Sequence, residues 1–327
     1  MRQDIVFYTH SSKTVGFGHA ARCAKIHNAL KEIDKKLSIG FMGKFDGASR
    51  ELLRRLCDPQ FVECSSAVVG VYDRMDDSEH PHIWSSEKLN HLMTISKHVI
   101  FMANGITNPG LPSDVTCIGY KPGRMETLNA PNFHWGLQYA PLDCDTLHSD
   151  AEWYRDKDQI FIALGGGATP LITKKIIDAC KRYKHSIKIK LLLSPVNSME
   201  EADEELNNIE NVDILKNLPE LSFYFRSSGI VIASYGHLGY EAMSYGTPVC
   251  LVGQKKFQFE YAEKLAKEGL CVSAGLLTKM SEKQLAKSIE NTFEISDSLA
   301  TKTKRTFDGG GIQRIASLIH KKFLSMA

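Results

Sequence analysis

The sequence lacks the features that would mark a membrane protein or a strongly charged binding protein. It has no apolar run near the roughly 18 residues of a membrane-spanning helix. Its first residues, MRQDIVFYTH, lack the pattern of a cleavable leader, so we expect a cytoplasmic protein without membrane insertion. Forty Lys and Arg residues against 38 Asp and Glu residues give a formal net charge of +2. This balance does not indicate a nucleic-acid partner, although it does not exclude nucleic acid as an acceptor.

The cysteines also lack the spacing of a metal or redox site. None of the eight forms a C-x-x-C pair, and most lie within apolar or helical patterns. In a chain of this length we expect reduced, scattered thiols of a cytosolic protein and no disulfide framework. The eight residues are Cys23, Cys57, Cys64, Cys117, Cys144, Cys180, Cys250 and Cys271.

Apolar segments alternate with segments of helical periodicity along most of the 327 residues. This alternation predicts an α/β protein with parallel sheets covered by helices. It lapses across 120–158, where prolines, glycines and charges gather, and VYDRMDDSEHPHIW at 71–84 is interpreted as a long loop. We predict two Rossmann-like domains, residues 1–145 and 146–310, followed by an amphipathic helix over 311–327. Two such domains predict a ligand cleft between them, lined by the carboxyl ends of both sheets.

The stretch VGFGHAARC at 15–23 has two glycines and a histidine where a strand turns into a helix. Gly16 and Gly18 permit a tight turn, and the helix N-terminus favours an anion. The same N-terminus disfavours a charged imidazolium, so His19 is a candidate general base, and Arg22 on the same helical face can share its ligand. Two simpler interpretations stay open: the glycines only make the turn, and His19 only caps its own helix.

Two further glycine turns lie in the second half of the chain. QIFIALGGGATP ends a buried strand in three glycines, an open backbone suited to phosphates or a reacting sugar. In ASYGHLGYEAMSYGTP a strand ends at Ser234, backbone N–H groups at 237–239 are placed to bind a diphosphate, and a helix carries Glu241. A carboxylate only accepts hydrogen bonds, so Glu241 suits the two hydroxyls of a ribose, although an acid near a helix start is also favoured by the helix dipole.

Together, the G-x-G-H-x-x-R-C start, the L-G-G-G loop, the G-x-x-x-x-E-A-x-x-x-G-T-P block and the D-G-G-G-I-Q-R-I ending resemble GT-B nucleotide-sugar enzymes. The resemblance is strongest to the UDP-sugar hydrolase of pseudaminic acid biosynthesis and to spore-coat polysaccharide proteins. It is weaker to the UDP-GlcNAc transferase of peptidoglycan synthesis. It implies a GT-B fold with an inter-domain cleft, a UDP-sugar held mainly by the C-terminal domain, no cofactor or essential metal, and a last helix that crosses back to the N-terminal domain.

The resemblance also implies residue roles. His19 matches the catalytic histidine, and NVDILKNLPEL matches the segment whose backbone meets the uracil. His237 departs from the family, which usually has serine or threonine at that position. The residues expected to bind the donor are Gly16, Gly18, Arg22, Gly165, Gly166, Gly167, Leu215, Leu218, Ser234, Gly236, His237, Leu238, Gly239 and Glu241.

We therefore expect a metal-independent glycosyltransferase that uses a nucleotide-diphosphate sugar, with His19 as general base and an unidentified hydroxyl acceptor. The motif details favour a hydrolase, whereas the long unmatched segment 64–158 favours a transferase with a larger acceptor. A non-catalytic sugar-nucleotide binder is a third possibility. An NAD-linked oxidoreductase is more distant, because GFGHAA fits G-x-G-x-x-A but Lys44 stands where the ribose-binding acid is expected. Asp143 and Asp145 have the Asp-x-Asp spacing of a metal-dependent transferase, but they lie in the predicted junction.

Overall fold

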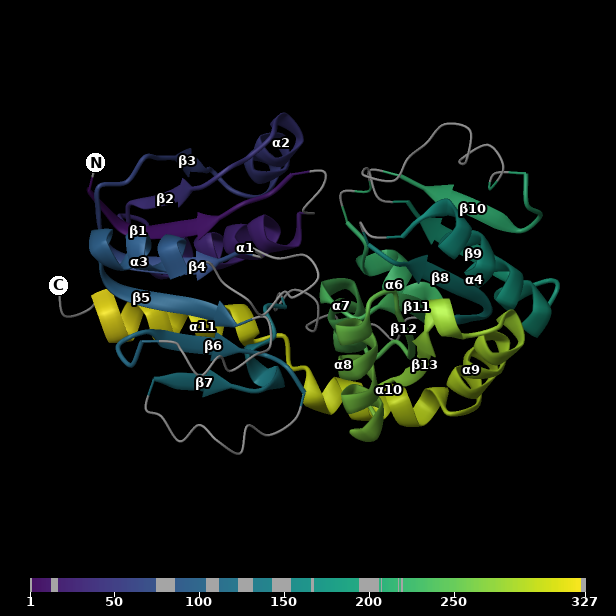
Figure 1. The fold of residues 1–327 in the computed structure, drawn as a ribbon. Helices are drawn as coiled ribbons and strands as arrows, with labels where there is room; N and C mark the ends of the chain where they lie inside the picture. Colours follow the sequence, from purple (N-terminus) through teal and green to yellow (C-terminus); the bar gives the residue numbers. More distant parts are fainter. Residues whose placement is uncertain are drawn as a thin grey trace. The chain divides into compact units, whose positions relative to one another are not determined.

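The computed structural model describes residues 2–12, 17–74, 86–103, 112–122, 132–142, 154–165, 168–193, 206, 208–216, 218 and 220–324. The chain divides into two compact units (Figure 1). Unit 1 comprises residues 1–144 and 309–327, and unit 2 comprises residues 145–308. Among the described residues, no helix is both long and apolar enough to cross a membrane.

Unit 1 is a parallel sheet with the strand order β3-β2-β1-β4-β5-β6-β7. Its described strands are β1 Arg2–Thr9, β2 Ile39–Met42, β3 Gln60–Phe61, β4 Ser66–Asp73, β5 Ser96–Ala103, β6 Thr116–Gly119 and β7 Phe133–Trp135. Its described helices are α1 Gly18–Ile33, α2 Gly47–Leu56, α3 Ser86–Ile95, α11 Gly311–Ile319, a 3-10 helix at Leu137–Tyr139 and a π-helix at His320–Leu324.

Alternation along the strands builds a core on each face of this sheet. Ile5 and Phe7 of β1 point to the face covered by α1 and α11, where Ile315 is fully buried. Val6 points to the opposite face, which α3 covers. The last helix therefore packs in unit 1 beside α1, although it follows unit 2 in the sequence (Figure 1).

The predicted loop over 71–84 began too early. Val71, Tyr72 and Asp73 form the end of β4, and Tyr72 is fully buried. Charged residues follow this strand end in the sequence, and they led to the prediction of a loop. Only the apolar residues before them show a β pattern. The rest of that stretch, from residue 75 on, lies outside the described residues.

Unit 2 is a second parallel sheet with the order β10-β9-β8-β11-β12-β13. Its described strands are β8 Asp156–Ala163, β9 Lys188–Leu192, β10 Val212–Leu215, β11 Ser228–Ser234, β12 Val249–Gly253 and β13 Val272–Leu276. Its described helices are α4 Pro170–Tyr183, α6 Ser222–Ser227, α7 His237–Ser244, α8 Lys256–Lys267, α9 Glu282–Glu294, α10 Ser296–Thr306 and a 3-10 helix at Leu277–Lys279.

One core of unit 2 lies between its sheet and helices α4 and α9. Ile160 and Ile162 of β8 pack with apolar residues of α4 and α9, including Ile176 and Ile289. Pro170 starts α4, and the Thr169 side chain accepts a hydrogen bond from the Ile172 N–H at 3.3 Å, which satisfies one of the free donors of the first turn.

Both sheets have the strand order of doubly wound Rossmann-like domains, which confirms the predicted fold class. Strand order reverses between β1 and β4 in unit 1 and between β8 and β11 in unit 2. In such sheets ligands bind beyond the carboxyl ends of the strands at this reversal. The candidate site is therefore sought at these two places.

Candidate functional site

A buried cluster of polar side chains lies at the strand-order reversal of unit 1. His19 is the second residue of α1, and Asp73 is the last residue of β4, which pairs with β1 so that Thr9 lies opposite Asp73. Since α1 starts beyond the carboxyl end of β1, the two side chains meet. His19 Nδ1 lies 2.7 Å from Asp73 Oδ1, and their exposed fractions are 8% and 0%.

Arg22 adds a positive charge to this cluster from the next turn of α1. Its Nε donates to Asp73 Oδ2 at 2.6 Å, its Nη2 donates to Asp73 Oδ1, and its Nη1 donates to the Tyr120 hydroxyl. Arg22 and Tyr120 are both buried. The prediction that His19 and Arg22 lie on one helical face is therefore confirmed, but the partner they share here is Asp73. A contact between Arg22 and the donor stays a prediction.

The cluster contains a buried carboxylate and a buried guanidinium. Burial raises the pKa of Asp73, but attraction to Arg22 and hydrogen bonds from His19 and Arg22 lower this pKa further, to well below its usual value. Burial lowers the pKa of Arg22, but Asp73 more than compensates and the pKa stays above its usual value. Burial, and to a smaller extent the negative charge of Asp73, raises the pKa of the Cys23 thiol. Asp73 and Arg22 are therefore ionised and Cys23 is neutral.

These charges decide which nitrogen of His19 can take up a proton. An ionised carboxylate only accepts hydrogen bonds, so Nδ1 donates to Asp73 and Nε2 carries the lone pair. Arg22 Nη2 also lies 3.0 Å from Nδ1. Because a guanidinium only donates, it makes no hydrogen bond to an Nδ1 that carries a hydrogen, and Nη2 donates to Asp73 Oδ1 instead. The imidazole of His10 stacks on that of His19, with ring centroids 6.5 Å apart and 12° between the planes. His19 is thus held with Nε2 as its basic atom.

Unit 2 brings together several predicted donor-binding residues at the carboxyl ends of β8 and β11. Gly165 follows β8 with a φ of +75°, and Gly236 precedes α7 with a φ of +155°. An added Cβ on either residue has no atom of the described residues within 4 Å, so the described part of the chain leaves space beside both turns. The N-cap residue of α7 is Gly236, which has no side chain to cap the first turn, and a helix start of this kind favours an anion.

Gly239 has a packing role that differs from the expected donor contact. A Cβ at Gly239 would lie 2.9 Å from Leu251 Cδ2, so glycine lets α7 approach β12 closely. Leu238 and Glu241 lie half-buried in α7. Tyr245 follows one turn after Glu241. Burial, and to a smaller extent the negative charge of Glu241, raises the pKa of the Tyr245 phenol. Contacts of these residues with a donor stay predictions.

Gln254 is a residue of this region that the sequence did not single out. It follows β12, and its Nε2 donates to the Leu164 carbonyl at 3.1 Å and to Ser234 Oγ at 2.5 Å. The carbonyl of Leu164 can only accept, which fixes the orientation of the amide. Gln254 thereby ties the end of β8 to the end of β11. Its Oε1 is buried and has no hydrogen-bond partner among the described residues.

Gly18 is the first residue of α1, and its contact with a donor stays a prediction. The other predicted residues fall into two groups. Leu215 ends β10, where its carbonyl accepts from the Leu193 N–H at 3.0 Å, and Leu218 lies half-buried after it, so their contact with a base stays a prediction. The other group lies outside the described residues and comprises Gly16, Gly166, Gly167, Asp143 and Asp145. In the described part of the chain, no group of three or more His, Cys, Asp or Glu residues is arranged to hold a metal ion.

Asp73 and Tyr120 are the other site residues that sequence reasoning missed. Each follows a short apolar run, SAVVGVY for Asp73 and TCIG for Tyr120, and so stands at the carboxyl end of a buried strand. A polar residue in that position was the available signal. They lie 54 and 98 residues from their partners His19 and Arg22, so their contacts depend on the strand order.

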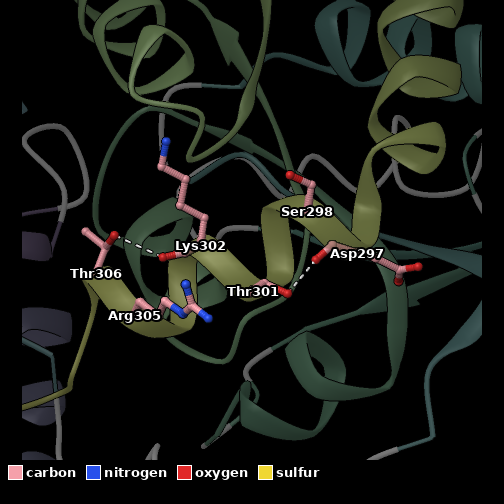
Figure 2. A pocket seen from close by; sticks show the side chains of 6 residues that line it. All are labelled: Asp297, Ser298, Thr301, Lys302, Arg305 and Thr306. Carbon is pink, nitrogen blue, oxygen red and sulfur yellow. Dashed lines mark hydrogen bonds between the residues drawn. The ribbon is translucent and has the colours of Figure 1, made fainter.

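A hollow along α10 lacks comparable chemistry (Figure 2). Thr301 Oγ1 donates to the Asp297 carbonyl at 2.9 Å, and Thr306 Oγ1 donates to the Lys302 carbonyl at 3.0 Å. The described residues that line it all come from this one helix: Asp297, Ser298, Thr301, Lys302, Arg305 and Thr306. Since its threonine hydroxyls are used within the helix, we do not regard it as the functional site.

No family model matches the chain. It is 26% identical over 302 residues to an uncharacterized protein of Methanocaldococcus jannaschii, with 81% of the chain aligned. The chain spans 60% of the length of that relative.

Solved structures resemble the chain over nearly its whole length. MurG of Acinetobacter baumannii has a TM-score of 0.62 at 13% identity, covering 97% of this chain and 99% of that one. The glycotransferase of kitacinnamycin has a TM-score of 0.63 at 13% identity, covering 98% of each chain. Medicago truncatula UGT71G1 complexed with UDP-glucose has a TM-score of 0.60 at 13% identity, covering 99% and 98%. The chain thus has the GT-B fold with two Rossmann-like domains, and its structural neighbours include glycosyltransferases and a UDP-N-acetylglucosamine 2-epimerase.

Proposed function

We propose that the protein is a metal-independent glycosyltransferase that uses a nucleotide-diphosphate sugar, with His19 Nε2 as the general base. The observation that carries this proposal is the buried contact of 2.7 Å between His19 Nδ1 and Asp73. A carboxylate that accepts from Nδ1 leaves Nε2 free and stabilises the imidazolium that forms when Nε2 takes a proton. Position at a strand-order reversal adds support, because ligands of such sheets bind there.

In this proposal unit 2 holds the nucleotide part of the donor. The N–H groups at the start of α7, with His237, bind the diphosphate, and Gly236 allows close approach of the backbone. Glu241 accepts hydrogen bonds from the ribose hydroxyls. The neighbour complexed with UDP-glucose supports a uridine donor as the first to test.

The proposed reaction is substitution at the anomeric carbon. An acceptor hydroxyl gives its proton to His19 Nε2 while its oxygen forms the new bond to that carbon. The bond from the carbon to the diphosphate oxygen breaks, and the nucleoside diphosphate leaves with the electron pair. The amides of α7 stabilise the negative charge that develops on the leaving group, which is the task a metal ion performs in other transferases.

A nucleotide-sugar hydrolase is the second candidate, because the sequence motifs resemble such an enzyme most closely. The same base would then deprotonate water, and the products would be free sugar and nucleoside diphosphate. Product analysis with and without added acceptors separates the two reactions. Release of free sugar at an unchanged rate when acceptors are added identifies the hydrolase.

One contact weakens the case for an NAD-linked oxidoreductase. Asp46 is the acid nearest the end of β2, where such enzymes bind the ribose. Its side chain accepts from the Ser49 N–H at 2.8 Å and from Ser49 Oγ at 2.7 Å, and it caps α2. This carboxylate is therefore engaged in holding a helix start.

The direct test is thermal unfolding with a panel of nucleoside diphosphates and NAD. A ligand at 100 times its dissociation constant stabilises the folded protein by about 2.7 kcal/mol. We expect a shift with UDP or another nucleoside diphosphate and none with NAD. A shift with NAD alone would contradict the proposal.

A further inference from the structure

We propose that Arg22, held by Tyr120, is a positioning residue whose charge offsets that of Asp73, so that His19 keeps an unprotonated Nε2 while Asp73 still orients its ring. The inference rests on the proposed role of His19 as a base. It concerns how the cluster combines an orienting carboxylate with a base that is still free to accept a proton.

The geometry places the two charges on one carboxylate. Arg22 contacts both oxygens of Asp73, through Nε at 2.6 Å and through Nη2, while His19 shares the Oδ1 atom with Nη2. Asp73 is fully buried and Arg22 is 4% exposed, so solvent screens these charges little. A carboxylate alone favours the protonated imidazole, whereas a neighbouring cation opposes it. The ion pair as a whole is neutral, and protonation of His19 leaves the buried group with a net positive charge.

Two of the other described groups around the cluster, Cys23 and Tyr120, are neutral. On α1, the Cys23 thiol donates to Asp73 Oδ2 at 3.5 Å, and its raised pKa keeps it neutral. The ring of His10, which follows β1, stacks on the ring of His19. Tyr120 follows β6, and burial raises the pKa of its hydroxyl, so it stays a neutral phenol. Among the described groups in contact with the cluster, Asp73 thus provides the negative charge and Arg22 the fixed positive charge.

Tyr120 holds the guanidinium in this arrangement. Its hydroxyl accepts from Nη1, and Arg22 Cζ lies 5.5 Å from the centre of its ring. The planar fork of arginine reaches two carboxylate oxygens and a phenol at once, which the single ammonium of a lysine cannot do. Loss of the Tyr120 hydroxyl therefore loosens the fork but leaves its charge in place.

The test is an NMR titration of the histidine side chains in the intact protein, in wild type and in Arg22→Gln, Asp73→Asn, Arg22→Gln/Asp73→Asn and Tyr120→Phe. The spectrum of His19→Asn identifies the His19 signals. We expect Arg22→Gln to move the titration midpoint of His19 to higher pH by about one unit or more, the usual effect of a charge within a few ångströms. Asp73→Asn should move it to lower pH, and the double variant should return it towards wild type. Tyr120→Phe should change it least.

A residue with a merely structural role would lower stability without moving the midpoint in opposite directions. An Arg22→Gln protein that is folded but titrates like wild type overturns the inference. If Arg22→Gln does not fold, the double variant is compared with Asp73→Asn: a higher His19 midpoint in the double variant supports the inference, and an equal midpoint overturns it. The titration needs no substrate, so an inactive protein with the expected midpoints contradicts the proposed function and leaves the charge balance standing.

Discussion

Replacing Asp73 with Asn tests the buried cluster through both activity and stability. The carboxylate accepts from His19 Nδ1 at 2.7 Å and from Arg22 Nε at 2.6 Å, and each oxygen has a donor. An amide keeps one acceptor and turns the other position into a donor, so either His19 or Arg22 faces an N–H group. If His19 loses its acceptor, the free lone pair is no longer fixed on Nε2. We expect turnover to fall about 10²–10⁴-fold, the range of a general base.

The same change leaves the Arg22 charge buried without its counterion. Breaking a buried ion pair in this way lowers the free energy of unfolding by about 3–5 kcal/mol. The free energy of unfolding of a whole domain is roughly 5–15 kcal/mol. Urea unfolding measures the loss. Asp158→Asn is the matched control, because the Asp158 side chain is 58% exposed beside Lys184, and its removal should change little. An Asp73→Asn protein with near wild-type turnover and unfolding free energy would refute this account.

Four further predictions concern the donor site, acidic pH and metal ions. Glu241→Gln should weaken UDP binding about tenfold, as expected for a lost hydrogen bond to a charged group, but 2′-deoxy-UDP binding less, as measured by calorimetry; an equal loss for both would contradict ribose recognition. If the buried Oε1 of Gln254, which has no hydrogen-bond partner among the described residues, accepts from a sugar hydroxyl, Gln254→Met should weaken binding of the UDP-sugar and leave UDP affinity unchanged; an equal loss for UDP would contradict this contact. The pKa of Asp73 is lowered in the folded state, so its stabilising contribution is present at neutral pH and is lost as the pH falls below about 4; acid unfolding of Asp73→Asn should lack this component, and an identical pH profile would contradict it. Turnover should persist in EDTA, and loss of activity that Mg²⁺ restores would contradict a metal-independent reaction.

The sequence predicted the fold class because each element carries its own signal. DIVFYT and GIVIAS are apolar runs with β-branched residues, and the helices between strands show the 3.6-residue period. Strand β11 ends at Ser234 and helix α7 carries Glu241, as predicted. The helix that begins near His19 was predicted from the helical periodicity of HAARCAKIHNALKEI.

The contacts within the site could not be predicted in the same way. His19 meets Asp73 because β1 lies next to β4, and Arg22 meets Tyr120 because β6 belongs to the same sheet. A period or a turn signal fixes an element but not its neighbours in the sheet. Gln254 was missed for the same reason, because its two partners belong to β8 and β11 or the residues that directly follow them. The sequence therefore indicated His19 as the candidate base but not the groups that contact it.

The most direct test of the central claim is the rate of nucleoside diphosphate release from UDP-sugars by wild type and by His19→Ala. Both proteins should bind UDP with similar affinity, since we propose that unit 2 holds the nucleotide. We expect His19→Ala to release UDP about 10²–10⁴-fold more slowly. Equal rates in the two proteins, with binding intact, would contradict the assignment of His19 as the base.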